Sequence, residues 1–251
     1  MIKQYEGIVI FLIPPEKVVN GGIISIFSLA KESRRFENIH KSKIIISAYP
    51  NYKSYKYNDL FKNDEHIYDF SDAIKTKTSK KNLIIHIPEY AAYDIYFELL
   101  KYKDALKSFK NIHINILNQN IEMMPNISYL AQYRLLANEL TQTTAHKKYC
   151  SQEISDKYYM PTHEFSVHID EVNYQRISYE GKKKRILFSN DKSDNKIKVI
   201  TSLRKMFPTF EFEEIKSVTY EQYKNKIREA LYVITFGEGF DGYYIESIFS
   251  G

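Results

Sequence analysis

The amino-acid sequence predicts an α/β protein with two domains, each built on a mostly parallel, doubly wound sheet, the second of which is incomplete. Short apolar runs alternate with segments whose apolar residues recur at helical spacing, and this alternation begins again after residue 180. Strands that alternate with helices are joined by right-handed crossovers, which makes neighbouring strands parallel. Ligand sites are therefore expected at the carboxyl ends of the strands.

Four strands and two amphipathic helices are expected in the first part of the chain. Each helix has apolar residues at the i, i+3, i+4, i+7 spacing that lines one face, so both faces should pack on the sheet. The strands are expected at residues 7–13, 43–48, 82–87 and 112–117, and the two faces consist of Ile23, Ile26, Phe27 and Ala30, and of Tyr93, Tyr96, Phe97 and Leu100.

The second part of the chain repeats the pattern over a shorter length. Strands are expected at residues 185–189, 210–215 and 231–236, with helices marked by Ile200, Leu203 and Phe207, and by Tyr220, Tyr223, Ile227 and Ala230. Residues 161–181 have mixed polarity and no long periodic segment. We therefore expect a first domain over residues 1–165, a linker over 166–181 and a partial second domain over 182–251.

Composition excludes several functional classes. The 251 residues carry a net charge of +5 and a single cysteine, Cys150, which forms no internal disulfide. No apolar run is long enough to span a membrane, and a cytoplasmic location is expected. Lysines are interleaved with acidic residues, so no nucleic-acid partner is expected; the basic run from Lys182 to Arg185 is interpreted as a solvated strand start, with weak attraction to anionic lipid or a phosphorylated ligand left open. Zinc-hydrolase, P-loop and serine-hydrolase motifs are absent.

The last segment, TFGEGFDGYYIESIFSG, carries the most specific pattern. A strand leads into a loop with Gly237, Gly239 and Gly242, after which a helix begins. Glu238 on the loop and Glu246 in the first helical turns can both face the crevice at the strand end. Glycines allow close backbone approach to a ligand, helix-start amides favour phosphate, and carboxylates accept hydrogen bonds from sugar hydroxyls. The alternative is that both glutamates lie on a solvated helix face.

This strand, E-G-F and E-x7-E arrangement resembles the donor site of retaining GT-B glycosyltransferases of the large family-four-like group. The resemblance implies two Rossmann-like domains, an acceptor-side domain followed by a donor domain that is truncated at its carboxyl end. It places Glu238 by the transferred sugar and Glu246 on the ribose, with the backbone of Gly239 and Phe240 near the pyrophosphate. Asp241 stands where the family usually has a further glycine.

Three other segments fit the same resemblance. The run I-P-P-E-K-V-V-N-G-G resembles the family's first glycine-rich loop, which places Gly21 and Gly22 beside the donor pyrophosphate, although helix entry alone would explain them. His86, which ends the run NLIIHI, would bond a sugar hydroxyl or the leaving-group oxygen; the alternative is a partly buried histidine with a satisfied hydrogen bond. Lys192 and Lys196 would neutralise the diphosphate, or else are exposed loop charges.

The resulting hypothesis is a hexosyltransferase that uses a nucleoside diphosphate sugar and a glycan or lipid-linked acceptor in bacterial surface polysaccharide biosynthesis, such as capsule or lipopolysaccharide. Retention of anomeric configuration and a reaction without metal or other cofactor are implied by the resemblance. Contact with the inner face of the membrane and oligomerisation are left open. The alternative is a non-catalytic GT-B-like binding or scaffold protein, or an inactive fragment, that partners a full-length transferase.

Overall fold

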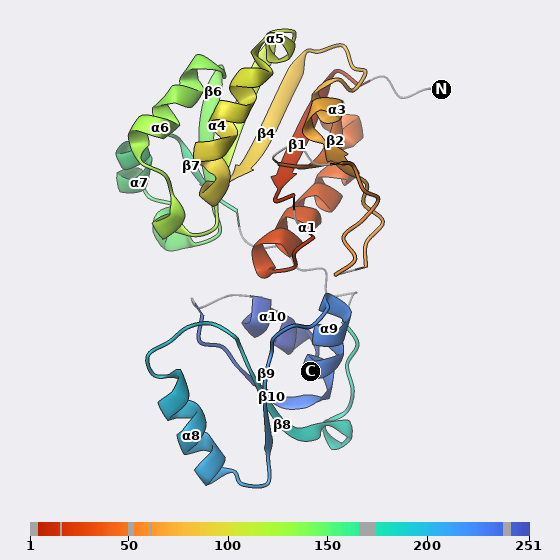
Figure 1. The fold of residues 1–251 in the computed structure, drawn as a ribbon, viewed down its shortest axis with the longest axis vertical. Helices are drawn as coiled ribbons and strands as arrows, with labels where there is room; N and C mark the ends of the chain where they lie inside the picture. Colours follow the sequence, from red (N-terminus) through yellow and green to blue (C-terminus); the bar gives the residue numbers. More distant parts are fainter. Residues whose placement is uncertain (1–4, 16, 50–52, 61, 166–173, 238–241) are drawn as a thin grey trace. The chain divides into compact units, whose positions relative to one another are not determined.

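The computed structural model describes residues 5–15, 17–49, 53–60, 62–165, 174–237 and 242–251. The chain divides into two compact units, residues 1–58 with 63–168, and residues 59–62 with 169–251. Each unit has its own parallel sheet with helices beside it (Figure 1). The α/β fold class with two doubly wound parallel sheets, the second one smaller, is therefore confirmed.

The first unit contains a seven-stranded sheet in the order β3-β2-β1-β4-β5-β6-β7. All of its strand pairs are parallel. The chain steps outward in one direction from β1 and in the other direction from β4, so the topological switch point lies between these two strands. The strands are β1 (Gly7–Ile13), β2 (Ser42–Ala48), β3 (Ile67–Asp69), β4 (Asn82–Pro88), β5 (Asn111–Asn118), β6 (Glu139–Thr144) and β7 (Thr162–Glu164).

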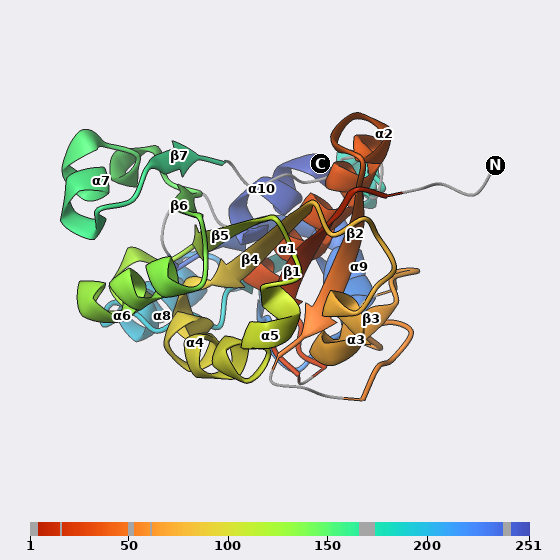
Figure 2. The same ribbon diagram turned by 90° about the horizontal axis from the view of Figure 1, so that it is seen from above.

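Helices cover both faces of this sheet (Figure 2). The expected face of α1 (Gly21–Arg35) is confirmed, since Ile23, Ile26, Phe27 and Ala30 are buried. The opposite face of the sheet packs on α3 (Phe70–Ile74), α4 (Ala92–Lys101), α5 (Lys103–Leu106) and α6 (Ile127–Gln132). The remaining helical segments of this unit are α2 (Glu37–His40), η1 (Glu89–Ala91), η2 (Ile121–Met123), η3 (Tyr133–Leu135), η4 (Lys147–Tyr149) and α7 (Gln152–Tyr158).

The face of α4 that was expected to pack on the sheet is wrong, because the buried face is rotated around the helix axis. The helix buries Ala92, Ile95, Tyr96 and Leu99, whereas Tyr93, Phe97 and Leu100 are exposed. Apolar residues occupy most positions of this segment, so the sequence allowed two overlapping helical faces. The face with small and aliphatic residues packs on the strands. The aromatic rings of Tyr93 and Phe97 instead contact each other edge to face, 5.3 Å between centroids.

The second unit contains a three-stranded parallel sheet in the order β10-β8-β9. Its core consists of Leu187, Ile215, Tyr223, Ile227 and Ala230. All three expected strands and both expected helices form, and a further helix begins at Gly242. The elements are η6 (Tyr179–Gly181), β8 (Lys183–Phe188), α8 (Lys196–Met206), β9 (Glu211–Glu214), α9 (Tyr220–Glu229), β10 (Ala230–Ile234) and α10 (Gly242–Phe249).

The chain that leads into β8 lies against α10. Tyr174 packs on Phe249 with 5.9 Å between ring centroids, and the Arg176 Nε donates to the Phe249 carbonyl at 3.0 Å. Residues 174–181, which the sequence assigns to the linker, thus lie in the second unit.

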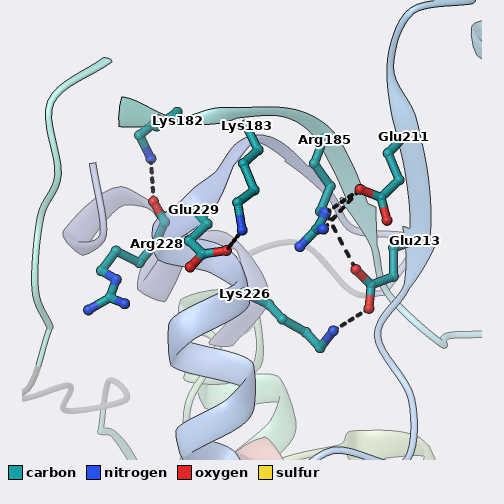
Figure 3. A network of polar contacts seen from close by, with 8 residues as sticks. All are labelled: Lys182, Lys183, Arg185, Glu211, Glu213, Lys226, Arg228 and Glu229. Atoms are coloured by element: carbon teal, nitrogen blue, oxygen red, sulfur yellow. Dashed lines mark hydrogen bonds and ion pairs between the residues drawn. The ribbon is translucent and has the colours of Figure 1, made fainter. Parts of the chain in front are cut away.

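Three residues of the basic run at the start of β8 have polar partners within the second unit (Figure 3). The Lys182 Nζ donates to the Arg228 carbonyl at 3.2 Å, and Lys183 pairs with Glu229 at 2.5 Å. Arg185 lies between Glu211 and Glu213, at 2.9 Å and 3.6 Å. The network lies at the amino ends of β8 and β9, away from the edge where ligands of parallel sheets bind.

The pairing of β1 with β4 predicts the effect of one glycine substitution. A Cβ at Gly7 would overlap the Asn82 carbonyl oxygen on β4, so Gly7→Ala should lower the free energy of unfolding by about 1–3 kcal/mol. Gly21→Ala is the matched control, because a Cβ there meets nothing within 4 Å and should raise stability by about 0.5 kcal/mol. Urea unfolding of both variants measures these values, and equal stabilities would contradict the tight β1–β4 contact.

Candidate functional site

The carboxyl edge of the first sheet has a cavity at the topological switch point. It has a volume of about 190 Å³ and lies between the segments that follow β1, β2 and β4. Pro14, Pro15, Tyr49, Pro88, Tyr90 and Asp94 line it. Proline and tyrosine walls with one carboxylate suit a small ring that carries hydroxyl groups.

The two glycines of the predicted first loop open α1. Asn20 caps this helix through its side-chain oxygen, which accepts from the Ile23 amide at 2.9 Å. A Cβ at Gly22 would meet the end of the Gln119 side chain, which would have to shift, and the Gln119 Nε2 donates to the Gly22 carbonyl at 3.2 Å. Gly21 has open space around its Cα. The structure thus gives Gly22 a contact with the loop after β5 and leaves Gly21 accessible.

His86 lies near the end of β4 in a polar network. Its Nδ1 is 3.1 Å from the Asn115 Oδ1 on β5, and its ring stacks on Phe11 of β1 at 4.4 Å. Burial lowers the pKa of His86 to about 4, although the Asn115 hydrogen bond acts in the opposite direction. His86 is therefore a neutral imidazole near pH 7.

Glu89 is a candidate that the sequence reasoning missed. It is 3% exposed, and its Oε1 accepts from the Asn120 amide at 3.0 Å. Its Oε2 is buried and has no hydrogen-bond partner among the residues that the structure describes. Burial raises the pKa of Glu89, against the lowering effect of the backbone hydrogen bonds. Its position directly after the strand that carries His86 was the available sequence signal.

In the second unit, Glu246 is buried between α10 and its neighbours. Its side chain is 5% exposed, and its Oε1 accepts from the hydroxyls of Tyr174 at 2.9 Å and Tyr220 at 2.8 Å. The two hydroxyls lie 2.6 Å apart. Burial, and then the Glu246 charge, raise the pKa of both phenols, so both keep their protons. The glutamate is thus held in place rather than solvated on an exposed helix face.

The predicted phosphate-binding lysines differ in their surroundings. Lys196 pairs with Glu214 at 2.7 Å and its Nζ lies 5.5 Å from the centre of the Phe188 ring, whereas Lys192 is exposed on the loop after β8. Lys216 also pairs with Glu214, at 3.1 Å, and the two lysines lower the pKa of that carboxyl.

The structure brings together some of the predicted residues and not others. Gly22 and His86 both contact side chains of β5 or of the loop after it, whereas Lys196 and Glu246 have different partners. Glu238, Gly239 and Phe240 lie outside the described residues. The described residues include no group of three or more histidine, cysteine or acidic side chains arranged to hold a metal ion. None of the described helices has the length and apolar character of a membrane span.

The solved structures that the chain resembles are distant ones. No protein-family model matches the chain, and no curated protein matches it. The chain resembles an alpha-glucosyltransferase in complex with UDP-glucose and DNA containing an abasic site, at 12% identity and a TM-score of 0.49, over 91% of this chain and 67% of that chain. It also resembles an alpha-glucosyltransferase in complex with UDP and a 13-mer DNA containing an HMU base, at 12% identity and a TM-score of 0.49, over 92% and 67%. At these values the likeness carries no weight for function.

The lowered pKa of His86 predicts how stability depends on pH. The folded state binds fewer protons than the unfolded state between pH 6.5 and about 4. The neutral His86 therefore makes its full contribution to the free energy of unfolding above pH 6.5, and this contribution is lost as pH falls toward 4. The loss should be roughly 2 kcal/mol. His86→Gln should remove it, while His66→Gln, at an exposed histidine, should keep the wild-type dependence. Urea unfolding at pH 4.5 and 7 measures both; identical pH dependence in all three proteins would contradict the burial of His86.

The raised pKa of Glu89 predicts a pH dependence of opposite sign. The contribution of Glu89 to the free energy of unfolding is greatest below pH 4.5. It falls as pH rises through the folded-state pKa, because the buried carboxylate charge is disfavoured. Glu89→Gln should therefore be more stable than wild type at pH 8, by more than the about 0.5 kcal/mol typical of surface changes, and equal to it near pH 4. Glu98→Gln, which removes a carboxylate paired with Lys101, is the control and should give no such gain.

Proposed function

We propose that the chain is a GT-B-type glycosyltransferase that transfers a hexose from a nucleoside diphosphate sugar to a glycan or lipid-linked acceptor. The observation that carries the proposal is the buried Glu246 carboxylate in the helix that follows β10, held by Tyr174 and Tyr220. Ligands of parallel sheets bind at the carboxyl ends of the strands, and α10 begins there. Retention of configuration, a metal-independent reaction and a role in surface polysaccharide biosynthesis belong to the same proposal.

The surroundings of Glu246 support a role in binding hydroxyl groups. A carboxylate can accept several hydrogen bonds, and the hydroxyls of Tyr174 and Tyr220 already donate to Oε1. A Cβ at Gly242 would lie 3.7 Å from the other oxygen, Oε2, so the start of α10 lies close to the carboxylate. Ribose hydroxyls would bind Glu246 by sharing or replacing these phenol contacts. Glu238, Gly239 and Phe240 would complete this site from the preceding loop.

The diphosphate would be neutralised by Lys192, Lys196 and the first amides of α10. Lys196 pairs with Glu214. Its ammonium group would therefore contact the phosphate oxygens either while it keeps this ion pair or after it leaves Glu214. Lys216 pairs with the same carboxylate, which therefore keeps one cationic partner when Lys196 moves. The cost of releasing Lys196 is lowered in this way.

The first unit would supply the acceptor side. The switch-point cavity offers tyrosine and proline surfaces and the Asp94 carboxylate to a hydroxyl-bearing ring. Gly21 and Gly22 would allow approach of the donor phosphates at the start of α1, and His86 would contact the transferred sugar. The leaving diphosphate itself would take the proton of the acceptor hydroxyl. No protein nucleophile is assigned.

One observation favours the non-catalytic alternative. Lys196 already has a carboxylate partner, which lowers the positive charge available to a donor. A protein that binds a nucleotide weakly and partners a full-length transferase would tolerate this arrangement.

Calorimetric titration with UDP, GDP, UDP-glucose and GDP-mannose tests the proposal. Micromolar binding of one nucleotide series is expected, and Glu246→Gln should weaken it at least tenfold because hydrogen bonds to a charged carboxylate are lost. Glu229→Gln, which removes a carboxylate paired with Lys183, is the matched control and should bind as wild type does. Circular dichroism shows whether each variant is folded.

Release of free nucleotide from the sugar donor that binds separates the two functions. Binding with turnover supports the enzyme, and binding without turnover supports the non-catalytic protein. A folded wild-type chain that binds none of the four compounds would contradict the donor site altogether.

A further inference from the structure

We infer that Asn115 is a positioning residue for His86, which it holds with the proton on Nδ1 so that Nε2 accepts a hydrogen bond from a sugar hydroxyl. The sugar as ligand rests on the proposed function; the position of the proton does not. The inference decides between the two roles considered for His86, since an acceptor can bind a hydroxyl but cannot donate a proton to a leaving-group oxygen.

Strand register places the two side chains next to each other. His86 and Asn115 are paired residues of the parallel strands β4 and β5, so their side chains leave the sheet on the same face. Asn115 is 3% exposed, and its Oδ1 lies 3.1 Å from the His86 Nδ1. An amide oxygen has no proton to give, so the hydrogen of this bond must come from the imidazole.

The amide orientation is supported by threonines on β6. The Thr143 hydroxyl donates to the Asn115 Oδ1 at 3.1 Å, and the Asn115 Nδ2 donates to the Thr141 Oγ1 at 2.9 Å. Thr141 in turn contacts the His113 Nε2 at 2.7 Å. In this orientation every polar atom of the amide has a partner of the matching kind, because Oδ1 accepts from Thr143 and Nδ2 donates to Thr141.

The ring of His86 is also fixed in its plane. Phe11 on β1 stacks on it with ring planes 17° apart and centroids 4.4 Å apart. A ring held by stacking on one side and by a hydrogen bond at Nδ1 keeps the Nε2 lone pair in one direction. The low pKa of His86 agrees with this arrangement, because it keeps Nε2 unprotonated near pH 7.

A neutral acceptor of this kind suits a sugar. Hydroxyl groups donate to an imidazole nitrogen without requiring a charge, and the bond is strong in a partly buried site because water competes weakly. A phosphate group offers no proton to such an acceptor near pH 7. His86 is therefore expected to distinguish the sugar of a donor from its nucleotide diphosphate.

Nitrogen chemical shifts of imidazole give the direct test. In the full-length chain labelled with ¹⁵N-histidine, the wild-type His86 signals should show a protonated Nδ1 and an unprotonated Nε2 at pH 7. Asn115→Leu should give a mixture of both tautomers, and Asn115→Asp should keep the Nδ1-protonated form because a carboxylate also accepts from Nδ1. Asn118→Leu is the matched control: it removes a buried amide of the same strand, bonded to Gln142, and should leave the His86 signals unchanged.

A wild-type His86 protonated at Nε2 would overturn the inference, and this measurement requires no variant to fold. The second arm is calorimetric titration of UDP-glucose, GDP-mannose, UDP and GDP. Asn115→Leu should weaken binding of the sugar nucleotide about tenfold and leave the matching nucleotide unchanged, with rescue in Asn115→Asp. Equal weakening of both would show a structural role and overturn the sugar contact.

The chemical shifts and the titrations test the role of Asn115 and the proposed function separately. If no nucleotide binds to the wild type, the glycosyltransferase proposal and the sugar contact fail together, while the tautomer fixed by Asn115 is still decided by the chemical shifts. If nucleotides bind and the tautomer is the other one, the proposed function stands and the role of Asn115 fails.

Discussion

The parallel pairing of β1 with β4 is the constraint on which the first unit depends. It requires the bare backbone of Gly7 beside Asn82, and it places Phe11 against His86. The same pairing creates the switch point, since the segments after β1 and β4 diverge there and leave the cavity lined by Pro14 and Tyr90. The pairing thus sets the position of His86 in the sheet and of the two segments that line the cavity.

Both candidate sites use hydrogen bonds to hold a titratable group. In the first unit a buried amide faces His86, and in the second two phenols face Glu246. A buried polar group costs free energy unless it is hydrogen-bonded, so these partners stabilise the fold while they fix the direction of the remaining lone pairs. Glu89 is the contrasting case: one carboxylate oxygen is held by a backbone amide, and burial raises its pKa.

Periodicity in the sequence was enough to predict β1, β2, β4 and β5, the strands of the second unit, the division into two α/β parts and the buried face of α1. It did not predict β3, β6 and β7, which are short or carry polar residues. It failed for α4, where apolar residues on nearly every side allowed two faces and only contact with the strands selects Ile95 and Leu99. The sequence pointed to His86, Lys196 and Glu246, but not to Asn115, Tyr174 or Glu214. These partners are distant along the chain and are brought close by strand register or helix packing, which no local motif encodes.

The contacts of Tyr174 link the Glu246 carboxylate to the segment that leads into β8. Tyr174 follows residues 166–173 directly, and it is attached to α10 through Glu246 and Phe249. A ligand that competes for the Glu246 Oε1 must displace this phenol from the carboxylate. Occupancy of Glu246 would then loosen the segment before β8 from α10 within the second unit, so that the binding residue also acts as a clasp of its own domain.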